Sequence, residues 1–331
     1  MDTKMGNEFR AYRQTSTKNK RVHVGSCQFD ELTEGDKGMG LQEHYSQFHP
    51  LLFSIAYRML GTVSDAEDIV QDVYVHAEEI TIDHVQNKKA YLCKMVTNRC
   101  IDHLKSAGRK REFYTGPWLP EPLIFTENDP ETKVVNEEMI SFAFLLLLEK
   151  LKPMERAVFI LREVLDYDYR TIAQIVNRSE SNCRKIFSRS KNKFPLKNEE
   201  DQAFLDPNKD EIIQKFVLAL HHGQTQTIEK LLCDDVTLYS DGGGKVYAAL
   251  KPVHSKAQVV RFIGFLLAQN HSEEKPAFVK MVNVNGQTGL LVNGEDDVKT
   301  VICFHVENNQ IANIYIVRNP EKLQHVFLHA D

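Results

Sequence analysis

The sequence has a single tryptophan and no long apolar run, and these absences limit what kind of protein it can be. The longest continuous apolar run, residues 142–148, is far shorter than the roughly 20 residues that a membrane-spanning helix needs. The first residues contain no apolar core of signal-peptide length. We therefore expect a cytoplasmic protein with no membrane partner.

Closely spaced cysteine pairs are also missing. The six cysteines are scattered along the chain without a Cys-x-x-Cys motif. This spacing argues against a structural zinc site and against a thioredoxin-like redox motif, and favours reduced, buried thiols. We expect no metal and no other cofactor.

Basic residues are concentrated in two segments, although the whole chain has a formal net charge of −5. Residues 88–111 contain eight Lys or Arg against one acid, Asp102, and residues 170–197 contain eight against Glu180 alone. Residues 208–331, in contrast, contain 12 bases and 14 acids. A local field of one sign indicates contact with phosphate groups, so we expect nucleic-acid binding from the two basic segments only.

The first part of the chain is predicted to be helical after a polar leader. Residues 1–38 have no apolar period, which predicts disorder. Apolar residues then recur at three- and four-residue spacings over 41–60, 64–77 and 89–108, as in amphipathic helices. These helices predict a first all-α domain over residues 39–112. Its second helix carries polar residues off the apolar stripe that form either a solvated face or a docking surface for a basic partner: Asp65, Asp68, Gln71 and Asp72.

Residues 138–197 predict a second all-α domain that ends in a helix-turn-helix. A short helix over 169–176 stops at Asn177-Arg178, and Ser179 can cap a helix that continues to about residue 193. Two helices joined by a tight turn, the second exposing side chains that reach base edges, are typical of duplex recognition. The outward-facing side chains of the second helix are Ser181, Asn182, Arg184, Lys185, Ser188 and Arg189.

Residues 207–331 predict an α+β cone, with helices first and a curved antiparallel sheet after them. We expect helices over 209–222, 225–232 and 256–269, and strands over 236–240, 246–252, 278–284, 289–292, 298–306 and 311–317. Asn308-Asn309 between the last two strands indicates a hairpin turn. The fold class is therefore multidomain, with two all-α domains followed by an α+β cone.

A proline-rich joint, residues 113–137, connects the two all-α domains. It holds Trp118 and Leu119 within the run Trp-Leu-Pro-Glu-Pro-Leu. Its prolines exclude a helix interior and a central strand, and a flexible linker would leave the tryptophan and leucine wastefully exposed. We expect Trp118 and Leu119 to be buried against a neighbouring domain, and a stiff spacer without a partner is the alternative.

Together these segments resemble the extracytoplasmic-function (ECF) sigma factors of the sigma-70 superfamily. The runs LFSIAYRMLG at 52–61 and DAEDIVQD at 65–72 are similar to that family's region 2, and residues 138–194 are similar to its region 4. WLPEPL at 118–123, DGGGK at 241–245 and NPEKL at 319–323 are similar to motifs of the subgroup with a fused SnoaL-like domain. The resemblance implies a non-enzymatic sigma factor that directs promoter-specific transcription initiation.

The resemblance also implies a role for each surface. The acidic face of residues 65–72 would dock on the beta-prime clamp helices of core RNA polymerase, and region 4 would dock on its beta flap. The helix over 180–193 would enter the major groove of the minus-35 element, where Arg and Lys favour guanine and Asn favours adenine. The first basic helix would read and melt the minus-10 element of promoter DNA through Lys94, Asn98, Arg99, Asp102, Lys105 and Arg109.

The three subgroup motifs have no chemistry of their own, which favours intramolecular control of the two DNA-binding domains by the cone. We expect a monomer when free, with no dedicated anti-sigma factor required. The residues expected to make the regulatory contacts are Trp118, Leu119, Pro120, Glu121 and Pro122 in the joint, Asp241, Gly242, Gly243, Gly244 and Lys245 after a strand, and Asn319, Pro320 and Lys322 in the tail.

Some alternatives remain open at this point. Tyr91 stands where a tryptophan often opens the minus-10 helix of the family, so the same stacking contacts are not implied. SnoaL-like domains include isomerases and cyclases, and the polar residues that could serve such chemistry are Asp241, His254, His305 and Arg318. A ligand-responsive DNA-binding regulator that never contacts polymerase is a further alternative, distinguishable by transcription with core enzyme.

Overall fold

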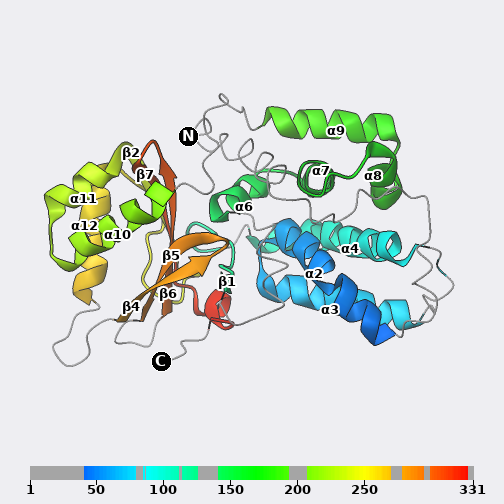
Figure 1. The fold of residues 1–331 in the computed structure, drawn as a ribbon, viewed down its shortest axis with the longest axis horizontal. Coiled ribbons are helices and arrows are strands. Elements are labelled where there is room, and N and C mark those ends of the chain that lie inside the picture. Colours follow the sequence, from blue (N-terminus) through cyan, green and yellow to red (C-terminus); the bar gives the residue numbers. More distant parts are fainter. Residues whose placement is uncertain are drawn as a thin grey trace. The chain divides into compact units, whose positions relative to one another are not determined.

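The computed structural model describes residues 41–79, 85, 87–111, 114–125, 141–193, 207–269, 278–293 and 299–326. These residues form two compact units (Figure 1). With the gaps given above, the described residues of the N-terminal unit are 41–110 and 141–193, and those of the C-terminal unit are 111, 114–125 and 207–326. The leader expected over 1–38 lies outside the described residues.

Three long helices open the N-terminal unit, as the apolar periodicity predicts: α2 (Leu41–Leu60), α3 (Val63–Glu79) and α4 (Lys88–Arg111). Helix α2 ends at Gly61, which adopts φ 73° and donates its amide to the Tyr57 carbonyl at 2.7 Å. The apolar stripes of these helices meet in a core that includes Leu52, Val70 and Val96, all fully buried. Each such side chain contributes roughly 1.5–3 kcal/mol relative to exposure.

The remaining helices of this unit are α6 (Phe142–Glu149), α7 (Pro153–Phe159), the π-helical turn η4 (Ile160–Val164), α8 (Tyr169–Val176) and α9 (Glu180–Asn192). Asn177 adopts φ 52° and ends α8, and the Ser179 hydroxyl accepts from the Asn182 amide at 3.3 Å to cap α9. The helix-turn-helix predicted from these residues is therefore confirmed. The π-helical turn was not predicted, because no residue in 160–164 disfavours an α-helix.

One buried arginine ties the two halves of this unit together. Arg156 on α7 donates Nη1 to the Met59 carbonyl on α2 and to Glu149 Oε1 on α6, both at 2.6 Å. Only 4% of its side chain is exposed. Removing one partner of a buried ion pair costs about 3–5 kcal/mol, so Arg156 holds the second helical domain against the first.

In the C-terminal unit the helices α10 (Pro207–His221), α11 (Thr225–Leu231) and α12 (Lys256–Gln269) lie on one face of the sheet (Figure 1). Its strands are β1 (Ile124–Phe125), β2 (Leu232–Asp241), β3 (Val253–His254), β4 (Phe278–Val284), β5 (Gln287–Asn293), β6 (Lys299–Glu307) and β7 (Gln310–Val317). Within the described residues the strand order is β1-β4-β5-β6-β7-β2-β3. A 3₁₀ turn, η5 (Pro320–Leu323), follows β7.

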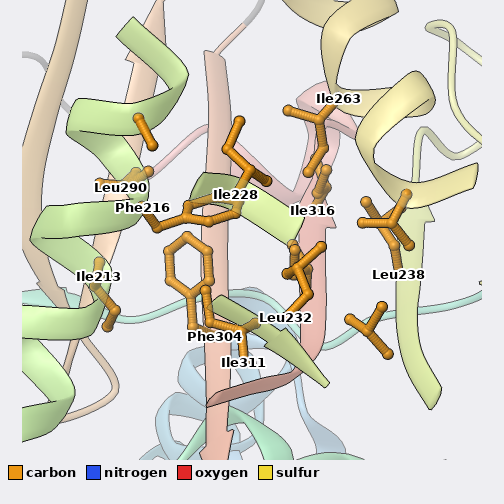
Figure 2. Close-up of a cluster of buried hydrophobic side chains, with 14 of the residues drawn as sticks. Ile213, Phe216, Ile228, Leu232, Leu238, Ile263, Leu290, Phe304, Ile311 and Ile316 are labelled. Atoms are coloured by element: carbon orange, nitrogen blue, oxygen red, sulfur yellow. The ribbon is translucent and has the colours of Figure 1, made fainter. Parts of the chain in front are cut away.

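Alternate residues of the strands point toward the helices and build the core of this unit. Figure 2 shows Phe216 of α10 against Phe304 of β6, whose ring centroids lie 5.6 Å apart in an edge-to-face arrangement. Leu238 and Ile316 come from the paired strands β2 and β7, and Ile263 comes from α12 (Figure 2). The α+β cone expected from the sequence is confirmed.

The sheet differs from expectation at its two edges. Strands β4 to β7 form the predicted antiparallel meander, and Asn308 and Asn309 turn the last hairpin with φ 48° and 59°. The strand predicted over 246–252 is wrong: this segment is a loop, and only the two residues of β3 pair with β2. Its apolar residues had suggested a strand. Leu250, however, is 68% exposed, so its apolar side chain is not buried in the sheet. Strand β1, which comes from the joint, was not predicted.

Candidate functional site

The three short motifs converge on the carboxylate of Asp241 in the C-terminal unit. Asp241 ends β2 and is fully buried. Its Oδ1 accepts from the Tyr114 hydroxyl at 2.5 Å and from the Gly243 amide at 3.0 Å. Its Oδ2 accepts from the Leu119 amide at 2.8 Å and from Lys322 Nζ at 2.7 Å. Four donors therefore satisfy a buried charge that would otherwise be costly.

Lys322 supplies the opposite charge from the tail of the chain. Its side chain is 6% exposed, and Nζ donates to the Leu119 carbonyl as well as to Asp241. The ammonium also lies 4.2 Å from the centroid of the Trp118 ring and 5.0 Å from that of Tyr114, a cation–π geometry. The three motifs therefore contact one another. We call the ion pair, together with the joint residues that contact it, the Asp241–Lys322 latch.

Tyr114 and Asn319 complete the hydrogen bonding around this pair. Asn319 Nδ2 donates to the Tyr114 oxygen at 3.0 Å, while its Oδ1 accepts from the Glu321 amide at 3.1 Å. Burial and the hydrogen bond to Asp241 raise the pKa of the Tyr114 hydroxyl. The hydroxyl therefore stays protonated and keeps donating to the carboxylate.

The glycine run after Asp241 permits this close packing. Gly243 adopts φ 60°, and a Cβ there would lie 2.4 Å from Asn319 Nδ2. Gly244 adopts φ 71°, and its Cβ would meet Thr115 at 3.1 Å. The run is therefore a tight turn against which the tail and the joint both pack. On the surface of this turn, Lys245 forms an exposed ion pair with Glu321.

The joint continues along the sheet edge beyond the latch. The Leu123 carbonyl accepts from the Asn285 amide at 2.8 Å, and its amide donates to Asn285 Oδ1 at 3.1 Å. Ile124 and Phe125 then pair with β4, and His325 Nε2 lies 2.8 Å from the Pro122 carbonyl. Leu119 is 1% exposed, and Pro120, Glu121 and Pro122 are buried, whereas Trp118 is only half-buried. Burial of Leu119 is as expected, and burial of Trp118 is less complete than expected.

The structure separates the two histidines considered for catalysis, His254 and His305, from Asp241. His254 pairs with Thr237 of β2, and His305 pairs with Asn313 of β7, which is itself paired with Thr237. This row lies four residues along β2 from Asp241, a distance of about 13 Å. His305 is buried against Glu307, with Nε2 and Oε1 2.8 Å apart, and Arg318 donates to the Tyr247 carbonyl at 2.8 Å. Asp241 itself is committed to the latch.

The acidic face expected on α3 lies at the surface of the N-terminal unit. Asp68, Gln71 and Asp72 are exposed and Asp65 is partly exposed. Asp72 Oδ2 lies 3.3 Å from Arg99 Nη1 on α4, and Asp65 Oδ2 lies 3.7 Å from His103 Nε2. Such exposed pairs contribute about 0.2–1 kcal/mol, so they leave the carboxylates available to another partner.

The candidate minus-10 residues line one side of α4. Lys94, Asp102 and Lys105 are exposed, and the last two form an ion pair at 2.7 Å. Asn98 Nδ2 donates to the Ile175 carbonyl on α8 at 3.1 Å, so the helix-turn-helix packs against this helix. Arg99 is half-buried beside Asp72, and the side chain of Arg109 lies outside the described residues.

On α9 the outward set expected from the sequence is confirmed as exposed: Ser181, Asn182, Arg184, Lys185, Ser188 and Arg189. Cys183 and Ser190 are fully buried and form the inner face, with Phe187 half-buried beside them. Ile186 is half-buried as well. The helix therefore presents a polar, basic side that can enter a DNA groove.

Several residues that build these sites were missed at the sequence level. Tyr114, Asn285 and His325 engage the joint, and Arg156 joins the helical domains. The position of Tyr114, just before the proline-rich run, is the one feature of the sequence that could have indicated a contact with the joint. The other contacts join residues more than 90 positions apart, which local patterns do not reveal.

In the part of the chain that the structure describes, no helix is long and apolar enough to cross a membrane. The described residues also hold no group of three or more potential metal ligands.

Residues 44–110 match the family model of Sigma-70 region 2, and residues 141–194 match that of Sigma-70 region 4. The ECF RNA polymerase sigma factor SigJ of Mycobacterium tuberculosis is 30% identical over 289 residues, which cover 84% of this chain and 92% of SigJ. The probable ECF sigma factor SigI of the same organism is 26% identical over 276 residues, covering 82% and 91%. The crystal structure of SigJ from M. tuberculosis is similar with a TM-score of 0.71 at 27% identity, covering 86% of this chain and 98% of that chain.

Proposed function

This chain belongs to the ECF RNA polymerase sigma factors, and we propose that its two helical domains divide promoter recognition while its SnoaL-like domain controls them. Members of this family are transcription initiation factors and not enzymes, and they bind core RNA polymerase and promoter DNA. In this proposal the protein works in the cytoplasm, is monomeric when free, and needs neither a membrane nor a dedicated anti-sigma factor.

The charges on the two helical domains support this division of labour. The acidic face of α3 docks on the beta-prime clamp helices, and the helix-turn-helix domain docks on the beta flap. The basic side of α4 contacts and melts the minus-10 element, where unstacking a base costs a few kcal/mol that a protein pocket offsets. The basic side of α9 enters the major groove at the minus-35 element.

Promoter binding then requires the N-terminal unit to open. The two promoter elements are about 25 base pairs apart, or about 85 Å along B-form DNA. In this structure Asn98 of the minus-10 helix lies within hydrogen-bonding distance of α8, which leads directly into α9. The two reading helices therefore reach both elements only after α8 leaves α4.

The latch limits how far the two domains can separate. The 29 residues 112–140 connect α4 to Ser141 and would span at most about 100 Å when fully extended. With residues 114–125 held on the C-terminal unit, the 15 residues 126–140 reach at most about 50 Å beyond the held segment. Tyr114 and Leu119 both bind the Asp241 carboxylate, so the held segment is folded back on itself. Release of the joint therefore lengthens the tether and favours the open, promoter-binding state.

The observation that carries this proposal is the contact set of Lys322. One ammonium from the tail touches the Asp241 carboxylate, the Leu119 carbonyl and the Trp118 ring. All three subgroup motifs thus meet at a single buried ion pair, although none of them forms a DNA-reading surface. This is the arrangement expected of a control element.

Run-off transcription tests the function directly. Core RNA polymerase with and without the full-length protein would be incubated with a template library carrying random sequence upstream of a constant transcribed region. The proposal expects defined start sites only when the protein is added to core enzyme. A protein that instead binds duplex DNA alone, and leaves initiation by core enzyme unchanged, is the ligand-responsive regulator.

Control by the C-terminal domain is tested in the same reaction. Truncation just before Asn319 removes Lys322 and opens the latch, and Trp118→Ala removes its cation–π contact. We expect both variants to initiate at the wild-type start sites with a higher yield. Unchanged yield from both variants contradicts control by the latch.

A further inference from the structure

Tyr169, at the start of α8, holds Arg184 of the candidate DNA-reading helix α9. The Arg184 guanidinium carbon lies 4.4 Å from the centroid of the Tyr169 ring. Arg162 of η4 places its guanidinium carbon 5.2 Å from the same centroid. Arg184 Nη2 also lies 3.2 Å from Glu180 Oε2, one turn earlier on α9. Arg184 is therefore held by a ring and a carboxylate while 59% of its side chain remains exposed.

The Tyr169 ring is itself held in place by packing against phenylalanine side chains. It meets the Phe187 ring edge-on, with centroids 6.2 Å apart, and Phe187 stacks on Phe159 of α7 at 5.8 Å. Arg162 is anchored by donating Nη1 to the Tyr167 carbonyl at 2.8 Å. A continuous stack therefore runs from the core of the helix-turn-helix to the tip of Arg184.

Building on the proposed minus-35 reading, we propose that Tyr169 is a positioning residue that presents Arg184 to a guanine. A guanidinium packed on an aromatic face keeps its edge accessible, and its in-plane N–H groups can bind O6 and N7 of guanine in a bidentate manner. The pair of Arg184 with Glu180 is exposed and therefore weak, so a base can replace that carboxylate at Nη2. The long arginine side chain normally loses rotamer freedom when it binds a base. The stack removes that freedom before DNA arrives, so Arg184 discriminates more sharply than a freely rotating arginine.

The other two cations of the outward-facing set on α9 lack this support. Lys191, which is not in that set, lies 5.6 Å from the Phe187 centroid and 3.6 Å from Glu163 Oε1. Lys185 and Arg189 are exposed, and among the described residues they have no hydrogen bond or ion pair that would fix them. Both can adapt to phosphates or to several bases, which suits binding strength more than discrimination. The structure thus singles out Arg184 as the specificity-determining cation of the helix.

The test uses the full-length protein with core RNA polymerase and the random template library described above. For this test each template also carries a barcode inside its transcribed region, so that sequencing the transcripts identifies the active templates and gives the base preference at each minus-35 position. The variants are Arg184→Ala, Tyr169→Leu and Tyr169→Phe. Arg170→Ala, a change of the residue next to Tyr169 on α8, serves as the control. Thermal unfolding of each variant reports whether the fold is retained.

We expect a guanine preference at one position that Arg184→Ala reduces about tenfold or more, the effect of losing a bidentate pair. Tyr169→Leu should reduce the preference at that same position about threefold, in line with an exposed cation–π contact. Tyr169→Phe keeps the ring and should restore the preference, and Arg170→Ala should leave it unchanged.

Three outcomes overturn the inference while leaving the sigma-factor function intact. One is wild-type preference at the Arg184-dependent position in Tyr169→Leu, and another is an equal loss at all positions, which marks a merely structural role. The third is a lack of any guanine preference that depends on Arg184. If wild-type protein gives no promoter-dependent transcript at all, the proposed function fails, and the inference with it.

Discussion

Replacing Lys322 by methionine should open the latch without leaving a cavity. Methionine is close to lysine in length and apolar volume, so the substitution removes the charge and little else. Asp241 would then remain fully buried with its counter-charge gone, while the Leu119 carbonyl would lose its donor. The cation–π contact with the Trp118 ring would disappear as well.

The expected magnitude follows from the burial of the pair. The side chains of Asp241 and Lys322 are 0% and 6% exposed, so solvent screens their attraction little. Removing one member of such a pair costs about 3–5 kcal/mol. This cost shifts the equilibrium between latched and released joint by roughly two to three and a half orders of magnitude.

Trp118 provides the assay because it is the only tryptophan in the chain. Its emission reports the latch directly, since its ring centroid lies 4.2 Å from the Lys322 ammonium. In Lys322→Met we expect a red-shifted emission and easier quenching by acrylamide under native conditions. Denaturant titration of the same signal should give a lower midpoint than in the wild type.

A matched control and a double mutant separate the pair from general damage. Lys245→Met removes a lysine from the neighbouring ion pair with Glu321, whose members are 47% and 61% exposed, and should cost no more than about 1 kcal/mol. Asp241→Asn combined with Lys322→Met should cost clearly less than the sum of the two single changes. Wild-type emission and quenching in Lys322→Met would refute the reasoning.

Three further changes probe the supporting structure. Gly243→Ala should weaken the latch, because φ 60° costs a side chain about 1–2 kcal/mol and the new Cβ would meet the Asn319 amide. Gly264→Ala is the control: its new Cβ would meet no atom within 4 Å, and the change should raise stability by about 0.5–1 kcal/mol. The denaturant midpoints of the two variants check both expectations. Arg156→Met should lower stability by about 3 kcal/mol, visible as a lower Tm, and an unchanged Tm would show that its buried contacts contribute little. Burial and Asp241 raise the pKa of Tyr114, so its contribution to stability is complete below about pH 10 and falls at higher pH; Tyr114→Phe should flatten that fall in pH-dependent unfolding.

The sequence predicted elements whose ends are decided locally. Ser179 and Asn177 mark the borders of the two helices of the helix-turn-helix through their own side chain and backbone preferences. Asn308 and Asn309 turn the last hairpin because asparagine tolerates positive φ. These positions carry their structural meaning without distant partners.

Elements that depend on distant partners were not predictable in the same way. The segment 246–252 looks like a strand, yet the tight turn at 242–245 leads the chain away from β2. Strand β1 has two residues and exists because β4 offers an edge beside Asn285. The latch was expected as a meeting of motifs, but the pairing of Asp241 with Lys322 and the role of Tyr114 follow only from the folded chain.

The central claim, that the SnoaL-like domain restrains a promoter-directing sigma factor through the latch, is tested most directly by comparing wild type and Lys322→Met in run-off transcription with core RNA polymerase. The account predicts transcripts from the same start sites for both proteins, with a higher yield from Lys322→Met because the released joint lengthens the tether. An equal or lower yield from a folded Lys322→Met protein would contradict it.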